Sequence, residues 1–392
     1  MNTDTTVSHY DALKQVGYYF SYTVDGKEEA IKIEHANIAD LQINWNSTEL
    51  FVDGYLIFKD TFRLTEVLPP VTNIYFKIKA YDFTWNNTDD GSSKYEESFI
   101  ITRIERQLSA NKDLTVRIDF LDKLYYYLSN TYVGKGYNSI KSTDVIKDIL
   151  QEIPITPNRK LNILSSNVEY DNLVIPQNKP FVSFIKAKEL SDGFSFIQSR
   201  YTLSTISHGI MNKAFPSLYK NGEGLKFVYD DINNEANPFK IKTIKFLSSD
   251  NLLFNVALPD CISYEFNQGD MSKPIRKIKD VGGFSESIGD SSTLVKINST
   301  IGFKRIEVSH QDGIDRFYKF KLLETSLIEI TVSGMFFYEL FYKVGLELKS
   351  TIPGMKTQMP YVNGTYHILK IVDKFNGTNF NQIITLGRVG IA

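Results

Sequence analysis

The feature that most limits the fold of this chain is a succession of short β-prone runs separated by turn signals. Residues 30–35 place Ile31 and Ile33 on one face and Lys32 and Glu34 on the other, the period-two alternation of a half-buried strand. Several such strands with turns about every 10–20 residues predict a small closed or sandwiched β-domain. The strands expected in this first region span residues 18–24, 30–35, 50–58, 74–83, 98–107 and 114–121.

A second set of β-prone runs occupies the end of the chain. Two Asn-Gly pairs, Asn363-Gly364 and Asn376-Gly377, flank strand-like segments there, and Asn-Gly is a strong signal for a hairpin turn. The sequence therefore predicts a second β-domain, similar in kind to the first. Its expected strands span residues 317–323, 327–332, 345–348, 366–372 and 382–386.

The middle of the chain has a different pattern. Ser142-Thr143-Asp144 offers a helix N-cap followed by an acid in the first turn, and an apolar stripe continues to Ile153 before Pro154. Pro180 is typical of a first helical residue, and Ser191-Asp192-Gly193 ends this second helix. A hairpin over residues 194–198 and 201–206 is expected next, and the Gly/Ser-rich run 282–292 is typical of a mobile loop.

These patterns divide the chain into four segments. Residues 1–125 are expected to form the first β-barrel domain, and residues 126–220 an α+β domain inserted after it. Residues 221–310 are a β-rich projecting segment with the mobile loop, and residues 311–392 the second β-barrel domain. The predicted fold class is mainly β with an α+β insert.

Composition excludes several classes of protein. The hydrophobic fraction of 42% is too high for a mainly disordered chain, and one cysteine, Cys261, cannot form an internal disulfide. The formal charge of −2 is unlike a nucleic-acid coat protein, which needs a surplus of Lys and Arg. Neither a secretory signal nor an apolar run long enough to span a membrane is visible, so a protein without a membrane span is expected.

The charge is unevenly distributed. Residues 1–100 contain 8 Lys or Arg and 16 Asp or Glu, a net charge of −8, so the rest of the chain carries +6. An acidic segment repels phosphate, although a solvated acidic surface explains the same count.

No motif predicts a catalytic, cofactor-binding or metal site. The five histidines are at least 26 residues apart, which is unlike a zinc site. Gly134-Lys135-Gly136 lacks the remaining residues of a phosphate-binding loop, and residues 283–287 lack the last glycine of a nucleophile elbow. Cys261 lies in a segment typical of a partly buried thiol. Adjacent acids such as Glu28/Glu29 and Glu96/Glu97 point to opposite faces of a strand, so a pair cannot share one substrate.

Several ordered segments resemble the baseplate hub proteins of contractile-tailed bacteriophages, which are related to the hubs of contractile injection systems. The segments are residues 50–60 (LFVDGYLIFKD), 65–69 (TEVLP), 99–105 (FIITRIE), 141–150 (KSTDVIKDIL), 180–185 (PFVSFI), 192–196 (DGFSF), 351–355 (TIPGM), 364–375 (GTYHILKIVDKF) and 380–388 (FNQIITLGR). Asp373-Lys374-Phe375 departs from the family pattern, which has His before the aromatic residue.

The resemblance implies a non-enzymatic structural protein of the virion, made in the host bacterial cytoplasm. Two similar barrels per subunit would form a homotrimeric, pseudo-sixfold ring that adapts the sixfold tail tube protein above to the threefold central spike protein below. Baseplate wedge proteins would contact its outside, and tape measure protein and DNA would pass through its lumen.

Three alternatives remain open at this point. A tail-tip protein of a non-contractile phage shares the same barrels. Outside this structural class, a glycan-binding module and a glycan-hydrolysing enzyme are the other two alternatives.

Overall fold

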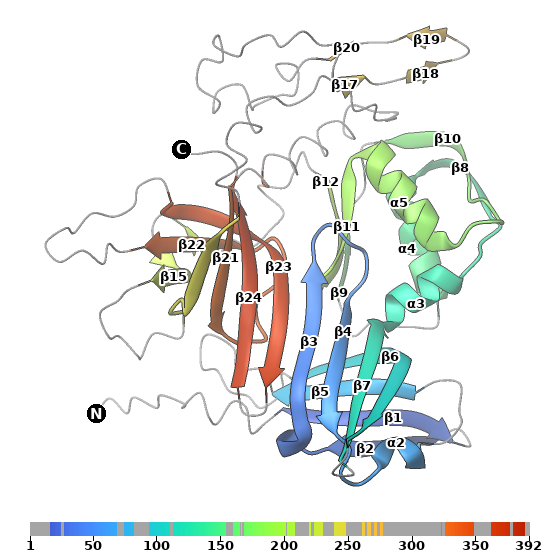
Figure 1. Ribbon diagram of the computed structural model, residues 1–392. Helices are drawn as coiled ribbons and strands as arrows, with labels where there is room; N and C mark the ends of the chain where they lie inside the picture. The colour runs from blue at the N-terminus through green and yellow to red at the C-terminus, as the bar shows by residue number, and fades with distance from the viewer. Residues whose placement is uncertain are drawn as a thin grey trace, which may run out of the picture.

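A computed structural model describes most of the N-terminal β-region, the insert after it and the C-terminal β-region. The described residues are 16–24, 27–68, 74–81, 94–109, 113–153, 160–164, 166, 168–200, 202–207, 219–220, 223–229, 239–247, 323, 326–348, 362–376 and 379–388, together with four short strands between residues 261 and 276. The protein is mainly β, as expected (Figure 1).

The strands of the first region form one antiparallel run. Alternating side chains explain it: on the third strand Leu41, Ile43 and Trp45 are buried, whereas the residues between them are not. The run follows the order β3-β4-β7-β6-β5-β1-β2. These strands are β1 (Gly17–Val24), β2 (Lys27–Ile33), β3 (Ile38–Asn46), β4 (Asp53–Lys59), β5 (Ile74–Tyr81), β6 (Lys94–Leu108) and β7 (Leu114–Asp122).

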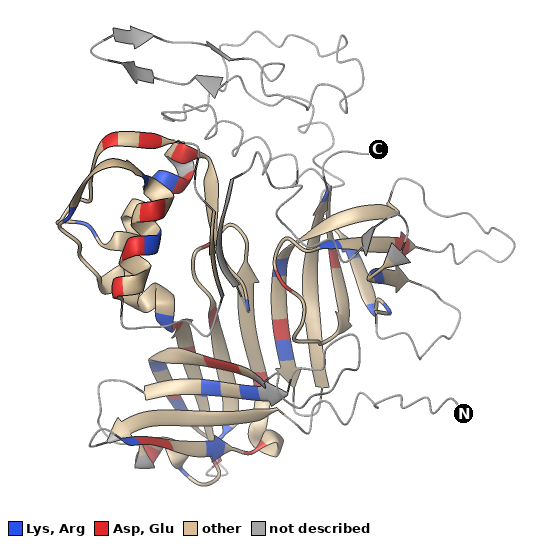
Figure 2. Ribbon diagram, turned by 180° about the vertical axis from the view of Figure 1, so that it is seen from behind, with Lys and Arg blue, Asp and Glu red and all other residues tan. Residues whose placement is uncertain are grey.

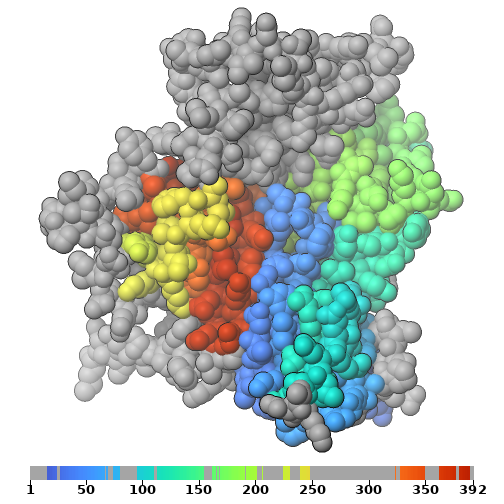
Figure 3. Space-filling model, in the orientation of Figure 1, coloured from blue at the N-terminus to red at the C-terminus, as the bar shows by residue number. Residues whose placement is uncertain are grey.

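The strands of the C-terminal region continue the same sheet. β23 pairs with β3 over Lys370–Phe375 and Asn46–Leu41, and this pairing joins both ends of the chain into one 13-stranded sheet. The red and blue segments accordingly lie side by side on one face (Figure 3). The added strands are β15 (Lys226–Tyr229), β16 (Thr243–Phe246), β21 (Ser326–Ser333), β22 (Lys343–Leu348), β23 (Gly364–Asn376) and β24 (Asn379–Arg388).

Residues 123–207 form a compact insert with its own apolar core. Leu128, Ile146, Phe181 and Ile185 are buried in that core, which is separate from the core of the large sheet. The insert extends from the end of β7 and lies beside the upper part of the sheet (Figure 1). Its elements are α3 (Lys123–Asn130), β8 (Gly136–Lys141), α4 (Ser142–Glu152), β9 (Lys160–Ile163), β10 (Glu169–Val174), α5 (Phe181–Asp192), β11 (Phe194–Gln198) and β12 (Thr202–Ser207).

The remaining elements are short. η1 (His35–Asn37) and α2 (Leu64–Val67) connect strands of the first region. The other short strands are β13 (Tyr219–Lys220), β14 (Glu223–Gly224), β17 (Cys261–Ile262), β18 (Glu265–Asn267), β19 (Asp270–Ser272) and β20 (Ile275–Arg276).

The two expected barrels are not seen as closed rings among the described strands. The main path runs from β16 to β2 without returning to its start. The edge of β3 that could pair within the first region is occupied by β23, so the two β-regions share one sheet. The four domain boundaries stay predictions.

Helix ends follow the sequence in one case and differ in another. α5 ends at Gly193, whose φ of 71° is left-handed, as expected for a glycine C-cap, whereas Pro180, expected as its first helical residue, is its N-cap. The expected Ser142 N-cap is wrong, because Lys141 is the N-cap of α4. The Ser142 hydroxyl instead donates to the Asp192 carboxylate at 2.5 Å. This hydrogen bond connects the start of α4 with the end of α5.

Two expected turns have different roles. Asn376-Gly377 does separate a hairpin, since β23 and β24 pair on either side of it. Asn363-Gly364 is not a tight hairpin turn, because β22 ends at Leu348 and β23 starts at Gly364. The Asn363 side chain accepts from the Leu348 amide at 2.7 Å and donates to its carbonyl, so it fixes the end of a longer connection.

Several expectations fall outside the described residues. These are the mobile loop 282–292, the elbow-like residues 283–287, strand 317–322 and the side chain of Cys261. Within the part of the chain that is described, no helix has the length and apolarity needed to cross a membrane.

Candidate functional site

One face of the large sheet carries a continuous set of polar side chains, which we call the polar face. It spans eight neighbouring antiparallel strands in the order β16-β21-β24-β23-β3-β4-β7-β6. On β3 the half-buried Gln42 and Asn44 alternate with the buried Leu41 and Ile43. Because strand side chains alternate between faces, every second residue of each strand points to this side.

In the N-terminal half of the polar face, several charged groups have partners on the same face. Arg117 Nε is 2.9 Å from Asp119 Oδ1 on β7, and Arg103 pairs with Glu105 on β6. Asp53 accepts from the Asn44 amide at 3.0 Å. The Arg117 guanidinium also lies 4.6 Å from the Tyr55 ring centroid. Charges of both signs are interspersed along the strands (Figure 2), so this half is a mixed polar surface rather than an acidic one.

The tyrosine of this half has a perturbed acidity. The Tyr55 hydroxyl donates to Asp40 Oδ2 at 2.8 Å. Partial burial first, and then this hydrogen bond to Asp40, raise the pKa of Tyr55 above its ordinary value. Tyr55 therefore stays neutral at physiological pH and acts as a hydrogen-bond donor.

A hollow of about 370 Å³ interrupts the C-terminal half of the polar face. Lys370 and Lys374 on β23 line it on either side of Val372. Ile383 of β24 is directly opposite Val372 in the sheet register and contributes to the same lining. The hollow thus has cationic ends and an apolar floor.

The polar face ends in two strand edges that have no partner among the described strands. From Thr102 to Leu108, β6 pairs with β7 only, because β5 leaves it at Ile100. At the other end, β16 pairs with β21 only. Large apolar side chains are exposed at both edges: Leu108 is 64% and Phe246 46% exposed. Open edges of this kind are ready templates for another chain.

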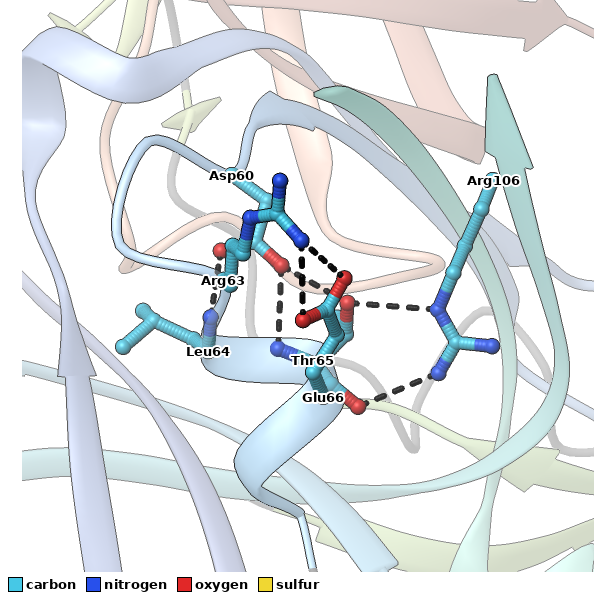
Figure 4. Close-up of polar contacts among 6 residues, drawn as sticks. All are labelled: Asp60, Arg63, Leu64, Thr65, Glu66 and Arg106. Carbon is cyan, nitrogen blue, oxygen red and sulfur yellow. Dashed lines mark hydrogen bonds and ion pairs between the residues drawn. The ribbon is translucent and has the colours of Figure 1, made fainter. Parts of the chain in front are cut away.

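The open edge of β6 is braced by a capping network around the buried Asp60 and Thr65 (Figure 4). Asp60 accepts from the backbone amides of Leu64 at 2.6 Å and Thr65 at 2.9 Å, and from the Thr65 hydroxyl at 2.7 Å. Arg106 of β6 donates to the Thr65 carbonyl at 3.1 Å and lies 3.3 Å from its hydroxyl. The network fixes α2 against β6, beside Phe62, which is 69% exposed.

The residues considered as chemical motifs are spread over the molecule. Lys135 of the Gly134-Lys135-Gly136 stretch is 2.8 Å from Asp148 Oδ2 and 3.0 Å from Glu152 Oε1, so its ammonium group is held by acids of α4. Side-chain hydrogen bonds to Asp148 first, and then to Glu152, raise its pKa. Glu28 contacts Lys77 through its carboxylate and accepts from Ser21.

The described histidines and acids do not gather at one site either. His35 and His367 are the described histidines, and they belong to different regions of the sheet. No group of three His, Cys, Asp or Glu that could hold a metal ion occurs in the described part of the chain.

Sequence reasoning did not single out the residues that form these surfaces. Lys370 and Lys374 lie two residues before and after Val372 on a strand, and this spacing is the signal that could have located the hollow. The open edges depend on which strands pair, which no local motif encodes.

Solved structures that resemble this chain are proteins of phage tails and related machines. No protein-family model and no curated protein matches the chain. The tail protein from Neisseria meningitidis MC58 superposes with a TM-score of 0.57 at 10% identity, covering 96% of this chain and 98% of that one. The 43 kDa tail protein of prophage MuSo2 from Shewanella oneidensis gives 0.54 at 10% identity, covering 96% and 100%.

The chain has the fold of phage tail proteins. The resemblance expected from the sequence motifs is thereby confirmed at the level of the fold. A chain of the PdpA–VgrG complex also shares this tail-protein fold, with a TM-score of 0.51 and 13% identity over 95% of this chain and 64% of that one. Near-complete coverage of both tail proteins means that the tail-protein fold includes the insert as well as the sheet.

Proposed function

We propose that this protein is the structural hub of a phage tail baseplate, a homotrimeric ring whose inner wall is the polar face. The observation that carries the proposal is the pair of open edges at opposite ends of eight antiparallel strands. An interface between two different edges of identical chains is head-to-tail, and such interfaces generate a closed ring when the rotation between successive copies closes and a helical filament when it does not.

Strand direction supports ring closure. Each of the eight strands runs antiparallel to its neighbour, so β6 and β16 run in opposite directions. β6 of one copy beside β16 of the next copy would therefore continue the antiparallel alternation. Three copies would contribute more strands than the ~16–18 that already leave an aqueous channel in a closed barrel.

The arrangement also suits a pseudo-sixfold adaptor. β16, β21, β24 and β23 make one group of four strands, and β3, β4, β7 and β6 make a second group. Six such groups around a trimer would match a sixfold tail tube protein above and a threefold central spike protein below. The insert, with its own core, would project toward the spike or the baseplate wedge proteins.

A mixed polar inner wall is compatible with the passage of tape measure protein and DNA. Of the acids in residues 1–100, Asp40 and Asp53 lie on the polar face and are hydrogen-bonded there. Strong binding of DNA needs a surplus of cations that releases counterions, and the N-terminal half of the face has no such surplus. The protein would act without enzymatic chemistry, as part of the virion.

The oligomeric state tests the proposal directly. Sedimentation and negative-stain imaging of the purified chain, alone and with its spike, are expected to show a trimer with a central hole. Phe246→Arg and Leu108→Arg each place a charge at one open edge and are expected to abolish the trimer while leaving thermal unfolding of the subunit nearly unchanged.

A matched control separates interface effects from general effects of added charge. Val174 is 69% exposed on β10 of the insert, away from both edges. Val174→Arg is expected to leave the trimer intact. A strict monomer at high concentration, or equal effects of all three substitutions, would contradict the ring. A monomer with measurable sugar affinity would favour a glycan-binding module instead.

A further inference from the structure

The residues that line the hollow follow β23, so the hollow suits a short segment of extended chain. Val372 is opposite Ile383 on β24 and Asn44 on β3 in the sheet register, so it forms the centre of the floor. Leu247, just after β16, adds a third apolar side chain to the lining. Lys370 and Lys374 flank this floor along β23, and their Cα atoms are ~13 Å apart at ~3.3 Å per residue.

The two lysines differ from the arginines of the polar face. Arg117 and Arg103 each have an acid partner on their own strand. Lys370 and Lys374 make no ion pair with any residue in the described ranges. Uncompensated cations at the ends of a hollow attract anionic groups, and the effect is stronger where the surroundings are partly apolar.

The neighbouring side chains limit the place where anionic groups can bind to the row of Lys370 and Lys374 on β23. Glu329 of β21 is opposite Thr385, which is in turn opposite Lys370, so an acid lies two strands away on that side. On the other side are the amides of Gln42 and Asn44, which are hydrogen-bonded to each other at 2.9 Å. Amide side chains can bond to a peptide main chain without requiring charge.

We propose that this hollow binds an extended acidic segment of a partner protein. The segment has the pattern acid-x-apolar-x-acid, because in an extended chain residues two and four apart project from the same side. Its two carboxylates reach Lys370 and Lys374, and the apolar side chain between them packs on Val372 and Ile383. The hollow is complete within one chain, so this binding does not depend on ring formation.

The lining favours a peptide over nucleic acid. Single-stranded nucleic acids are held by a continuous cationic groove together with aromatic side chains on which bases stack. The described lining of the hollow contains no aromatic residue, and Glu329 would repel a second row of phosphates.

A labelled peptide tests the site on the full-length protein. The probe is Gly-Asp-Ser-Leu-Ser-Asp-Gly, and its control carries Asn in place of both Asp residues. Fluorescence anisotropy at low salt is expected to show binding of the probe that weakens as salt rises. Lys370→Gln and Lys374→Gln are each expected to weaken it threefold to tenfold, as for the loss of one charged contact.

The control variant is Lys59→Gln. Lys59 is exposed on β4 of the same face, outside the hollow, and its replacement is expected to leave probe binding unchanged. Equal binding of the Asn control peptide, equal effects of all three lysine variants, or binding of a dT oligonucleotide in preference to the peptide would each overturn the proposal.

Discussion

Arg200 and Asp373 form a buried ion pair, with side chains 1% exposed each, although 173 residues separate them along the chain. The Arg200 Nη2 atom is 2.5 and 2.7 Å from the two carboxylate oxygens. Asp373 also accepts from Trp45 Nε1 at 3.0 Å and from Gln382 Nε2 at 2.7 Å. One carboxylate on β23 therefore connects the insert with β3 and β24.

Removing the charge of Asp373 is expected to destabilise the protein strongly. In Asp373→Asn the Arg200 guanidinium stays buried without its counter-charge, and breaking a buried pair costs about 3–5 kcal/mol. The free energy of unfolding in urea measures the loss. Arg117→Gln is the control, because its pair with Asp119 is partly exposed and such pairs contribute under about 1 kcal/mol. Equal losses in the two variants would contradict a special role for the buried pair.

Asp60 is expected to be the main support of α2. Asp60→Ala removes three hydrogen bonds to Leu64 and Thr65, and loss of a capping side chain costs about 0.5–2 kcal/mol. Chemical denaturation measures this change. Glu66→Gln removes only an exposed ion pair to Arg63 at 3.2 Å, so its expected cost is a few tenths of a kcal/mol. A larger loss in Glu66→Gln than in Asp60→Ala would show that the capping network does not hold α2.

The sequence predicted strands well where apolar residues alternate beside a recognisable turn. β5, β7 and β21 occur close to their expected positions. β3 was missed even though it is central to the sheet, because Asp40, Gln42, Asn44 and Asn46 make it appear polar. Its signal is the alternation of Leu41, Ile43 and Trp45.

Local sequence patterns could not predict which strands that are distant in the sequence pair with each other. The β3–β23 joint brings Trp45 beside Ile371, and nothing near either residue specifies the other as its partner. For the same reason the open edges, the hollow and the Arg200–Asp373 pair could not be derived from motifs. Register depends on which faces are buried together, and that is fixed by the whole sheet.

Gly54 is expected to tolerate no side chain at the β3–β4–β7 contact. A Cβ at this position would be 2.2 Å from the Gln42 carbonyl oxygen and 2.6 Å from the Phe120 ring. Overpacking of this kind costs about 1–3 kcal/mol, so Gly54→Ala is expected to lower the melting temperature clearly. Gly136→Ala is the control, since its Cβ would meet only a Val174 methyl at 4.0 Å. Similar melting temperatures of the two variants would contradict the close approach.

His367 is expected to make the protein less stable in acid. The pKa of this imidazole is lowered from 6.5 to about 4: burial is the main cause, a hydrogen bond to the Phe341 carbonyl opposes it, and Lys343 on the paired strand β22 adds to the lowering. Above pH 6.5 the ring is neutral in both the folded and the unfolded chain. Between about pH 6.5 and 4 the unfolded chain binds a proton that the folded chain does not, so the free energy of unfolding falls as the pH falls.

The size of this loss of unfolding free energy follows from the pKa shift of His367. At 1.36 kcal/mol per unit, His367 contributes a loss of about 3 kcal/mol by pH 4, and little further loss below it. Urea unfolding at pH 7.5 and pH 4.5 measures the change in the parent chain and in His367→Gln, which keeps a donor for Phe341 but does not titrate. Carboxylates titrate equally in both chains, so the variant is expected to lose less stability between the two pH values. Parallel losses would show that His367 is protonated in the folded protein at its ordinary pKa.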